Sequence, residues 1–526
     1  MHWADRIAEE IIAREDKDSY VCASGITPSG SVHIGNFRDT VTAWFVCLAL
    51  RKRGKGARLL YSWDDYDRLR KVPANVAEID GDFARYIGMP VSDVPDPFGC
   101  CESYCAHFEK EFEQALATFG IAADCRYQSK ENQSGRYAPH IITAMHKRGE
   151  IFDILDSFRT QEAQPGEREA YYPVSIYCPV CGKDSTTIAA YDQASETASY
   201  TCECGHAGVF DFHTDHHCKL SWKTDWPMRW MVEGVDFEPA GKDHSSPTGS
   251  YATSKIISER VFGYRPPVYA GFEFIGFKGA NWQAGKMSSS TGLNITPTEM
   301  FRLYQPEVIL WLYAKTDPMK AFNFCFDEEI LRQYFEFDKM LTAVREGQAN
   351  ELTRDITGYC AIPGREVKTV PMAQLVSFGS IVEFVPEMLE TIFEKIGTPF
   401  AREDFAERVD LAKYWLYQCS PESIYRLRET PDQAFYDALP AGEQAEIGLL
   451  YRYLMEQDYT MDDLQAYLYA IPAQARGALD AAETKRCQAQ FFRNVYQLLI
   501  GAERGPRLYL FLFALEKEQY IHLLKF

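Results

Sequence analysis

The stretch that decides the fold is Thr27–Asn36, TPSGSVHIGN. It follows a short apolar run, 20–23, and precedes a segment whose apolar residues recur at the 3, 4, 7 spacing of a helix, namely Val41, Trp44, Phe45 and Leu48. Residues 59–63 (LLYSW) then have the composition of a second strand. Strand, helix, strand units build parallel sheets whose ligands lie at the carboxyl ends of the strands, so the sequence predicts an α/β protein.

Length and composition indicate a multidomain protein that folds throughout. At about 150 residues per domain, 526 residues predict three or four domains, and 46% hydrophobic residues supply their cores. The opening, 1–15, carries Ile7, Ile11 and Ile12 at helical spacing, which predicts an amphipathic helix and not a signal peptide. No apolar stretch approaches about 18 residues, so we expect no membrane span and a cytosolic protein.

Net charge and cysteine content point in different directions. A formal charge of −20 argues against a polyanionic partner unless positive charge is concentrated locally, as it is in 51–58 (RKRGKGAR). The simpler interpretation of that run is a solvated turn between a helix and a strand. The 15 cysteines of a cytosolic chain are expected to be reduced, and their clusters indicate metal ligands before disulfides.

Changes of pattern along the chain predict four segments. Residues 1–90 form the first half of the sheet domain, and 91–217, rich in turns and cysteines, form an insertion. Strand-like residues resume in 218–337, the second half, and lead into a Lys-Met-Ser-Ser-Ser segment at 286–290. In 338–526 glycines become rarer and apolar residues take helical spacing, which predicts a helical domain.

Two segments have the chemistry of a phosphate site. The 27–36 loop joins a strand to a helix, where free N–H groups and the helix dipole attract anions; Gly30 and Gly35 permit close approach, and His33 and Asn36 offer donors. Lys286 adds a point charge, and Ser288 and Ser289 add rotatable hydroxyls. Either segment alone is also typical of an ordinary loop.

Taken together, the two segments resemble the class I aminoacyl-tRNA synthetases. The signature motifs of that family usually read His-Ile-Gly-His and Lys-Met-Ser-Lys-Ser, and this chain departs from each at one position, with Asn36 and Ser289. The departures resemble the lysyl branch. Further stretches similar to that branch cover the chain from near residue 20 to Gly292 and reappear weakly at 505–508: they are 25–30, 62–68, 225–230 and 234–244.

The resemblance implies a fold, a reaction and partners. The fold is a Rossmann-type parallel-sheet catalytic domain with a zinc-binding insertion that contacts the tRNA acceptor stem, followed by an α-helical anticodon-binding domain. The reaction joins lysine to ATP, with Mg²⁺, as lysyl-adenylate and transfers the lysyl group to the 3′ end of tRNA(Lys). We expect a monomer.

The implied catalytic residues act by stabilising phosphate charge, since this chemistry needs positioning and electrostatics more than a protein nucleophile. They are His33, Asn36 and Lys286. The implied ATP-binding set is Pro28, Gly30, His33, Gly35, Asn36, Lys286, Ser288 and Ser289.

A lysine pocket needs an anion or an aromatic face for the ammonium group, and tryptophan is the best cation–π partner. By the resemblance, the lysine-binding residues are Gly25, Thr27, Asp39, Trp222, His244 and Phe272. Asp39 stands where the family usually has glutamate, so either the pocket closes slightly or a water bridges the gap. Phe272 stands where tyrosine is frequent.

Two cysteine clusters predict zinc. Cys178, Cys181, Cys202 and Cys204 have the two-knuckle spacing of a structural zinc ribbon, although His206 is an alternative to Cys204. The second cluster is less regular and is also consistent with a helix entry that contains incidental cysteines. For it the resemblance implies the ligands Asp96, Cys100, Cys101 and His107. The sequence thus predicts one zinc ion and offers a candidate site for a second.

Three other functions remain open. A class I synthetase for glutamate or glutamine needs a cation where Asp39 and Trp222 stand. A nucleotidyltransferase without a tRNA partner does not need the long helical region. A non-catalytic zinc-dependent RNA-binding protein has no use for Lys286. Residues that read the anticodon are not evident; Arg507 and its aromatic neighbours are candidates only.

Overall fold

The computed structural model describes residues 1–159, 161, 163–246, 248–279, 295–477 and 479–526. Their internal contacts divide them into two compact units. The first contains Met1–Phe277, residues 295–324 and Val344–Arg365. The second contains Lys278, Gly279, Cys325–Ala343 and Glu366–Phe526. The chain passes between the units within the short strands β11 (Gly276–Lys278) and β12 (Asn323–Cys325).

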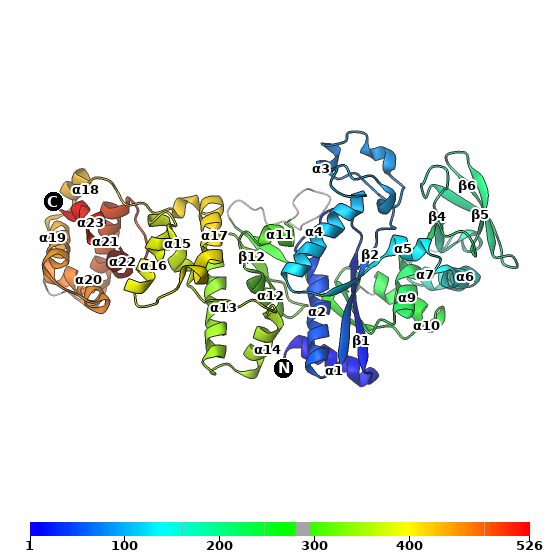
Figure 1. Ribbon diagram of the computed structural model, residues 1–526, viewed down its shortest axis with the longest axis horizontal. Helices are drawn as coiled ribbons and strands as arrows, with labels where there is room; N and C mark the ends of the chain where they lie inside the picture. Colours follow the sequence, from blue (N-terminus) through cyan, green and yellow to red (C-terminus); the bar gives the residue numbers. More distant parts are fainter. Residues whose placement is uncertain (160, 162, 247, 280–294, 478) are drawn as a thin grey trace. The chain divides into compact units, whose positions relative to one another are not determined.

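A five-stranded sheet forms the centre of the first unit (Figure 1). All its neighbouring strands run parallel, in the order β10-β9-β1-β2-β3. The predicted strand, helix, strand unit and the α/β class are confirmed. The strands are β1 (Ser19–Ile26), β2 (Gly56–Trp63), β3 (Ala123–Tyr127), β9 (Phe237–Gly241) and β10 (Val268–Phe272), and α2 (Phe37–Lys52) joins β1 to β2.

Helices cover both faces of this sheet. Successive side chains of a strand point to opposite faces. Ser24 of β1 hydrogen-bonds to Asp39 of α2, whereas its neighbour Ala23 clusters with Trp226 and Trp230 of α9 (Trp222–Glu233). α2 therefore covers one face and α9 the other. α2 is buried on nearly all sides, beyond the stripe that its 3, 4, 7 spacing indicates, because α1 and α12 pack on it as well.

The remaining helices of the first unit surround this core. The opening helix predicted from Ile7 and Ile11 is confirmed as α1, and both residues are buried. These helices are α1 (Trp3–Arg14), α3 (Ala74–Ala77), α4 (Tyr104–Thr118), α10 (Ser250–Arg260), α11 (Pro297–Met300), α12 (Pro306–Ala314) and α14 (Glu351–Cys360).

The stretch 91–217 is not uniform. Its residues 123–127 form β3, which adds an edge strand to the main sheet, and an antiparallel sheet in the order β5-β6-β7 follows later in the chain. Strands β4 and β8, which precede and follow these three strands in the sequence, pair with each other in an antiparallel arrangement. The further elements of the stretch are α5 (Gln128–Gln133), α6 (Ala138–His146), α7 (Arg148–Asp156), α8 (Glu167–Ala170), β4 (Val174–Ile176), β5 (Thr186–Asp192), β6 (Thr197–Cys202) and β7 (Ala207–Asp211), and β8 (Cys218–Leu220) follows directly after it.

The second unit is built from helices, as the apolar spacing predicts. Arg408 is buried in it and joins α17 to α13 through a bidentate ion pair with Asp338, at 2.7 and 2.8 Å. The helices are α13 (Glu329–Arg345), α15 (Met372–Ile381), α16 (Pro386–Lys395), α17 (Arg402–Cys419), α18 (Gln433–Ala438), α19 (Ala441–Glu456), α20 (Met461–Arg476), α21 (Ala481–Ile500), α22 (Leu508–Ala514) and α23 (Lys517–Tyr520).

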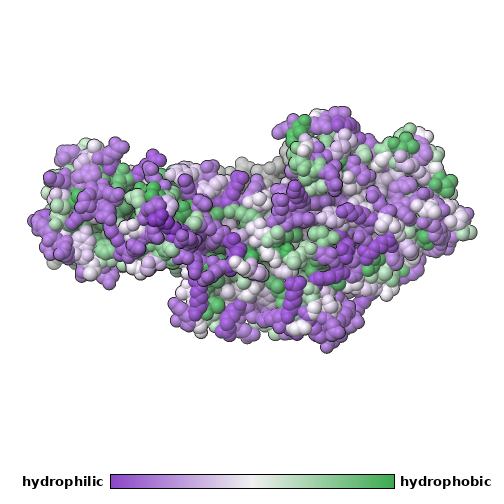
Figure 2. All heavy atoms as spheres, viewed as in Figure 1, coloured by the Kyte–Doolittle hydropathy of each residue, from purple (hydrophilic) through white to green (hydrophobic). Residues whose placement is uncertain are grey.

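The surface explains what becomes of the basic run 51–58. The face drawn in Figure 2 is mostly hydrophilic, with hydrophobic side chains in small separate patches. In the basic run Arg53 pairs with Asp5, Lys52 with Asp355 and Lys55 with Asp16, each at 2.5 Å. Arg58 pairs with Asp124 as well, so four of the five charges of the run have an acidic partner within the first unit. Within the described part of the chain, no helix is both long and apolar enough to cross a membrane.

Candidate active site

The strand order reverses between β1 and β9, and this places the candidate site. From β1 the chain adds β2 and β3 on one side, then returns to add β9 and β10 on the other. Open parallel sheets bind ligands at such a switch point, beyond the carboxyl ends of the strands. Both the 27–36 loop, which follows β1, and His244, which follows β9, lie at this edge.

Backbone and hydroxyl contacts fix the 27–36 loop from both sides. Its Val32 and Ile34 side chains are buried. The Ile34 N–H donates to the Ile295 carbonyl at 2.8 Å, and the Tyr313 hydroxyl donates to the Ile34 carbonyl at 2.6 Å. The polar groups of the loop are therefore presented on a rigid backbone at the start of α2.

His33 is neutral in this loop and its tautomer follows from one hydrogen bond. Burial lowers the pKa of His33 to about 4. The Asn36 N–H donates to His33 Nδ1 at 3.1 Å, so the proton of the neutral ring sits on Nε2, which is left to donate. The Asn36 side chain makes no capping hydrogen bond to α2. Two uncharged donors thus stand at the amino end of a helix.

Gly25 is required by close approach of two strands. It lies opposite Ser62 in the β1–β2 pairing, and a Cβ atom built on it comes within 2.6 Å of the Ser62 carbonyl oxygen. The backbone of β1 can therefore lie this close to β2 only with glycine at this position.

Two buried carboxyl groups lie near the switch point, Asp39 on the face of the sheet covered by α2 and Glu238 on the face covered by α9. Asp39 accepts a 2.6 Å hydrogen bond from the Ser24 hydroxyl, and Glu238 of β9 accepts one of the same length from the Trp230 indole. Burial, with a contribution from the Glu238 charge, raises the pKa of Asp39 to about 8. Burial likewise raises the pKa of Glu238 to about 7. Arg229 acts on Glu238 without offsetting its burial, and the carboxylate of Asp39 is favoured only by hydrogen bonds from Ser24 and the Gly25 backbone.

Glu238 was not among the predicted site residues, although it lies in the 234–244 stretch. A signal for it exists in the sequence, because a strand buried in a parallel sheet is usually apolar throughout, and Glu238 is the one charged residue of β9, FEPAG. Its proximity to Asp39, 199 positions earlier, has no local signal.

The predicted aromatic residues gather along α9. Trp222 and Trp226 stack with ring centroids 5.0 Å apart, and the His244 ring lies 6.1 Å from that of Trp226. Trp222 is 36% exposed, and its ring already carries the Arg229 guanidinium at 5.1 Å. Trp226, which was not among the predicted site residues, thus lies between Trp222 and His244.

Thr27 and Phe272 lie elsewhere at the same edge. The Thr27 hydroxyl donates to Asp67 at 2.6 Å, and Asp67 also pairs with the buried Lys219. Phe272 ends β10, is buried, and pairs in register with Gly241. Lys286, Ser288 and Ser289 lie outside the described residues.

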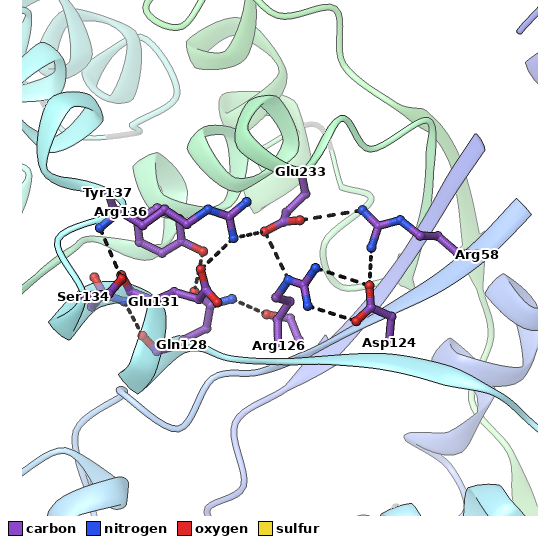
Figure 3. A network of polar contacts seen from close by, with 11 residues as sticks. Arg58, Asp124, Arg126, Gln128, Glu131, Ser134, Arg136, Tyr137 and Glu233 are labelled. Carbon is purple, nitrogen blue, oxygen red and sulfur yellow. Dashed lines mark hydrogen bonds and ion pairs between the residues drawn. The ribbon is translucent and has the colours of Figure 1, made fainter. Parts of the chain in front are cut away.

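A buried acid anchors the far end of α9 (Figure 3). Glu233, with a side chain only 6% exposed, ends this helix and pairs with Arg136 at 2.7 Å, Arg126 at 3.6 Å and Arg58 at 3.8 Å. Arg58 and Arg126 also contact Asp124, so β2 and β3 are tied to α9. This network fixes the helix that carries Trp222 against the edge of the sheet.

The first cysteine cluster has the geometry of a zinc site. The four Sγ atoms of Cys178, Cys181, Cys202 and Cys204 lie within 4.8 Å of one another, and two pairs are 3.7 Å apart. With Zn–S bonds of about 2.3 Å, tetrahedral geometry separates two sulfurs by about 3.8 Å. His206 instead faces Tyr200, at 3.4 Å from its hydroxyl.

The second cluster is organised by Asp96. Its carboxylate accepts the N–H groups of Cys100 and Cys101, each at 2.8 Å, and Cys100 Sγ lies 3.0 Å from His107 Nδ1. One ligand atom from each of Asp96, Cys100, Cys101 and His107 falls within a common 4.8 Å. The neighbouring Cys105 is absent from this group and faces a different set of side chains.

Comparison with known proteins identifies relatives along the whole chain. A family model described as tRNA synthetases class I (K) matches residues 1–360. A lysine–tRNA ligase of Pyrococcus furiosus is 35% identical, covering 100% of this chain and 99% of that protein. One from Treponema pallidum is 36% identical, covering 97% and 95%. Among solved structures, a glutamate tRNA ligase from Elizabethkingia meningosepticum covers 97% of this chain and 98% of its own, at 13% identity and a TM-score of 0.42.

Proposed function

The chain belongs to the class I (K) family of tRNA synthetases, and from that membership we propose that it is a lysine–tRNA ligase that uses ATP. In the first step the lysine carboxylate attacks the α-phosphorus of ATP, the bond to pyrophosphate breaks, and lysyl-adenylate forms. In the second a terminal ribose hydroxyl of tRNA(Lys) attacks the lysyl carbonyl carbon and AMP leaves. tRNA(Lys), lysine and ATP meet in the cytosol, where we expect the enzyme to act.

The observation that carries the choice of lysine is the carboxyl pair Asp39 and Glu238. Two acids raised in pKa by burial gain most from a ligand that brings a positive charge. The side-chain ammonium of lysine, placed beside Asp39, restores the charge of that acid and lowers the cost of ionising Glu238. Glutamate and glutamine have an α-ammonium but no second ammonium group on the side chain, so the two acids disfavour synthetases for those amino acids.

We place the lysine between the end of β1 and α9. Gly25 leaves space above the backbone of β1, Asp39 receives an ammonium group, and Trp222 and His244 form the wall with Trp226. Thr27 and Phe272 complete it. Because Arg229 lies over the Trp222 ring, we assign Trp222 to packing against the lysine chain and not to a cation–π contact with its ammonium.

We place ATP over the 27–36 loop. The His33 Nε2–H and the Asn36 amide donate to phosphate oxygens, and the N-terminal N–H groups of α2 add their dipole. Pro28, Gly30 and Gly35 shape the backbone around the nucleotide, and Lys286, Ser288 and Ser289 approach from the 286–290 segment. Mg²⁺, bound with ATP, neutralises the triphosphate.

We assign the zinc-ribbon cysteines to one structural zinc ion and the cluster of Asp96, Cys100, Cys101 and His107 to a second. Four protein ligands leave no open position, so neither ion takes part in the reaction. The 91–217 stretch, which holds both, is proposed to contact the acceptor stem, and the helices of 338–526 the anticodon, with the protein acting as a monomer.

The test is aminoacylation of total tRNA by the full chain, with each radiolabelled amino acid in turn. We expect label in tRNA with lysine alone. Labelling with another amino acid and not with lysine would overturn the specificity and keep the class. No labelling at all, with ATP and tRNA present, would overturn the synthetase function.

A paired variant tests the pocket. Asp39→Asn removes the ionisable acid and should raise the lysine KM at least about tenfold, since a buried ammonium loses its counter-ion, with little change in the ATP KM. The control is Asp16→Asn, an exposed acid paired with Lys55, which should leave both constants unchanged. Equal effects of Asp39→Asn on both KM values would remove Asp39 from the lysine pocket.

A further inference from the structure

A third group of metal-ligating side chains lies apart from both zinc clusters and from the lysine pocket. It consists of Asp65, directly beyond β2, and of Cys105 and Glu109, which are one turn apart on the same face of α4. Each offers one ligand atom, and the three atoms lie within 4.8 Å of one another. Neither the zinc assignments nor the proposed reaction uses any of the three.

All three side chains are withdrawn from bulk solvent. Asp65 is 3% exposed, Cys105 2% and Glu109 7%. Two carboxyl groups facing one another in such a place repel when both are ionised, and burial adds to the cost. A cation among them removes both penalties.

Glu109 supplies a separate observation that points to a ligand. Its Oε1 is buried and has no hydrogen-bond partner in the described part of the chain. Buried carboxylate oxygens are nearly always paired, so one left without a partner marks a place where a donor or an ion is missing. Asp65 contrasts with it, because the N–H and the hydroxyl of Ser129 both donate to its carboxylate and hold it in place.

The three side chains line one cavity of about 740 Å³. Five of the residues around it are carboxylic acids and two are lysines, so the cavity attracts cations and repels phosphate. One of those acids, Glu113, is already satisfied by the Trp63 indole and the Tyr127 hydroxyl, each at 2.9 Å. The cavity also gives an ion a way in.

We propose that Asp65, Cys105 and Glu109 bind a divalent transition-metal ion of the zinc class. Sulfur beside two carboxylate oxygens favours such an ion over Mg²⁺ or Ca²⁺, which prefer oxygen alone. Ligand atoms that share one tetrahedral Zn²⁺ lie roughly 3.3–3.8 Å apart, so the three, which lie within 4.8 Å of one another, need to approach by at most about 1.5 Å. On binding, the Cys105 thiol loses its proton to solvent, and the fourth position faces the cavity, where water completes the shell.

Counting zinc in the full-length protein tests this. After removal of metal and dialysis against Zn²⁺, Cys105→Ser should hold one zinc per chain fewer than the wild type, and Glu109→Gln should bind that ion at least tenfold more weakly. Two controls should keep the wild-type count. Cys360→Ser changes another buried cysteine, and Glu113→Gln removes a charge from the same cavity. A wild-type count in Cys105→Ser overturns the site.

Two further measurements separate this ion from the one near Asp96. Relative to the wild type, Cys100→Ser should bind one zinc ion fewer, and the double variant Cys100→Ser with Cys105→Ser should bind two fewer. If each single variant and the double variant all lose one ion, both sulfurs serve the same ion and the site is overturned. If Cys105→Ser does not fold, Co²⁺ titration of Glu109→Gln decides. In Glu109→Gln the absorption of one bound cobalt ion should appear only at a Co²⁺ concentration about tenfold higher than in the wild type. A titration curve identical to that of the wild type overturns the site.

Discussion

At the scale of single residues, burial sets the charge of the groups in the candidate site in opposite senses. Burial keeps His33 neutral by lowering its pKa, and keeps Asp39 protonated near neutral pH by raising its pKa. The first is a donor ready for phosphate. The second is an acid that ionises when a cation arrives, so the empty site carries little charge until its substrates bind.

The pKa of Asp39 makes the stability of the unliganded protein depend on pH. From an ordinary value of 3.8 it rises to about 8, so between these values the folded chain holds a proton that the unfolded chain has lost. The contribution of this residue to stability therefore falls as pH rises from about 4 to 8. Asp39→Asn removes that dependence, so its gain in Tm over the wild type should be small at pH 5 and clearly larger at pH 8.5.

Scanning fluorimetry without and with saturating lysine checks this. With lysine bound the gain should reverse in sign, because the wild-type carboxylate then has a counter-ion and the amide of the variant cannot replace it. A Tm difference that is the same at pH 5 and pH 8.5 contradicts the assignment of a protonated Asp39.

Gly25 gives a prediction from packing alone. Gly25→Ala brings a methyl group to 2.6 Å from the Ser62 carbonyl oxygen, in a part of the sheet where both partners are backbone. We expect a loss of about 1–3 kcal/mol in the free energy of unfolding, the usual cost of overpacking. Gly81→Ala is the matched control, since nothing lies within 4 Å of its added Cβ, and it should leave the urea midpoint unchanged.

At the scale of elements, α9 carries two roles at its two ends. Its first residue, Trp222, belongs to the proposed lysine pocket, and its last, Glu233, receives three arginines from the side of β2 and β3. A helix fixed at one end by ion pairs and along its length by Trp226 and Trp230 holds its other end in a defined place. If Trp222 lines the proposed pocket, we expect the position of the substrate to depend on contacts at the opposite end of the helix.

Glu233→Gln tests this anchor. The arginines lose a shared, nearly buried carboxylate but keep Asp124 and Glu131, so the free energy of unfolding should fall by about 1–3 kcal/mol, less than for a pair with no other partner. The lysine KM should rise with it. Glu131→Gln, which touches Arg136 alone, is the control and should have the smaller effect on both; equal effects would deny Glu233 a special role.

At the scale of the whole molecule, the chain is two compact units, each with its own buried side chains. Units with separate cores unfold as separate cooperative steps, so calorimetry should resolve two transitions. Arg408→Leu should shift only the transition of the second unit. The free energy of unfolding of that unit should fall by about 3–5 kcal/mol, because Asp338 loses its ion pair with the buried Arg408. Arg402→Leu, an exposed arginine on the same helix, should lower neither; a shift of both transitions by Arg408→Leu would contradict separate unfolding.

The sequence predicts what local spacing encodes. The 3, 4, 7 pattern from Val41 to Leu48 gives α2, the run 59–63 gives β2, and the two cysteine pairs of 178–204 come together because a short hairpin-like path joins them. The domain boundaries at 90, 217 and 337 stay predictions. They follow composition, whereas β3 at 123–127 joins the main sheet through pairing with β2, which composition does not reveal.

By itself the sequence determined the parallel α/β core and the family, because periodicity and motifs are properties of neighbouring residues, and the phosphate role of the loop after the first strand stays a prediction. Only the tertiary structure decided which distant side chains share a site. The charge of Glu238 in β9 acts on Asp39 in α2, and Asp65 meets Cys105 and Glu109 of α4, because the crossovers pack helices against strands that are distant in sequence. Burial among these elements then sets their charge, and no spacing in the sequence records it.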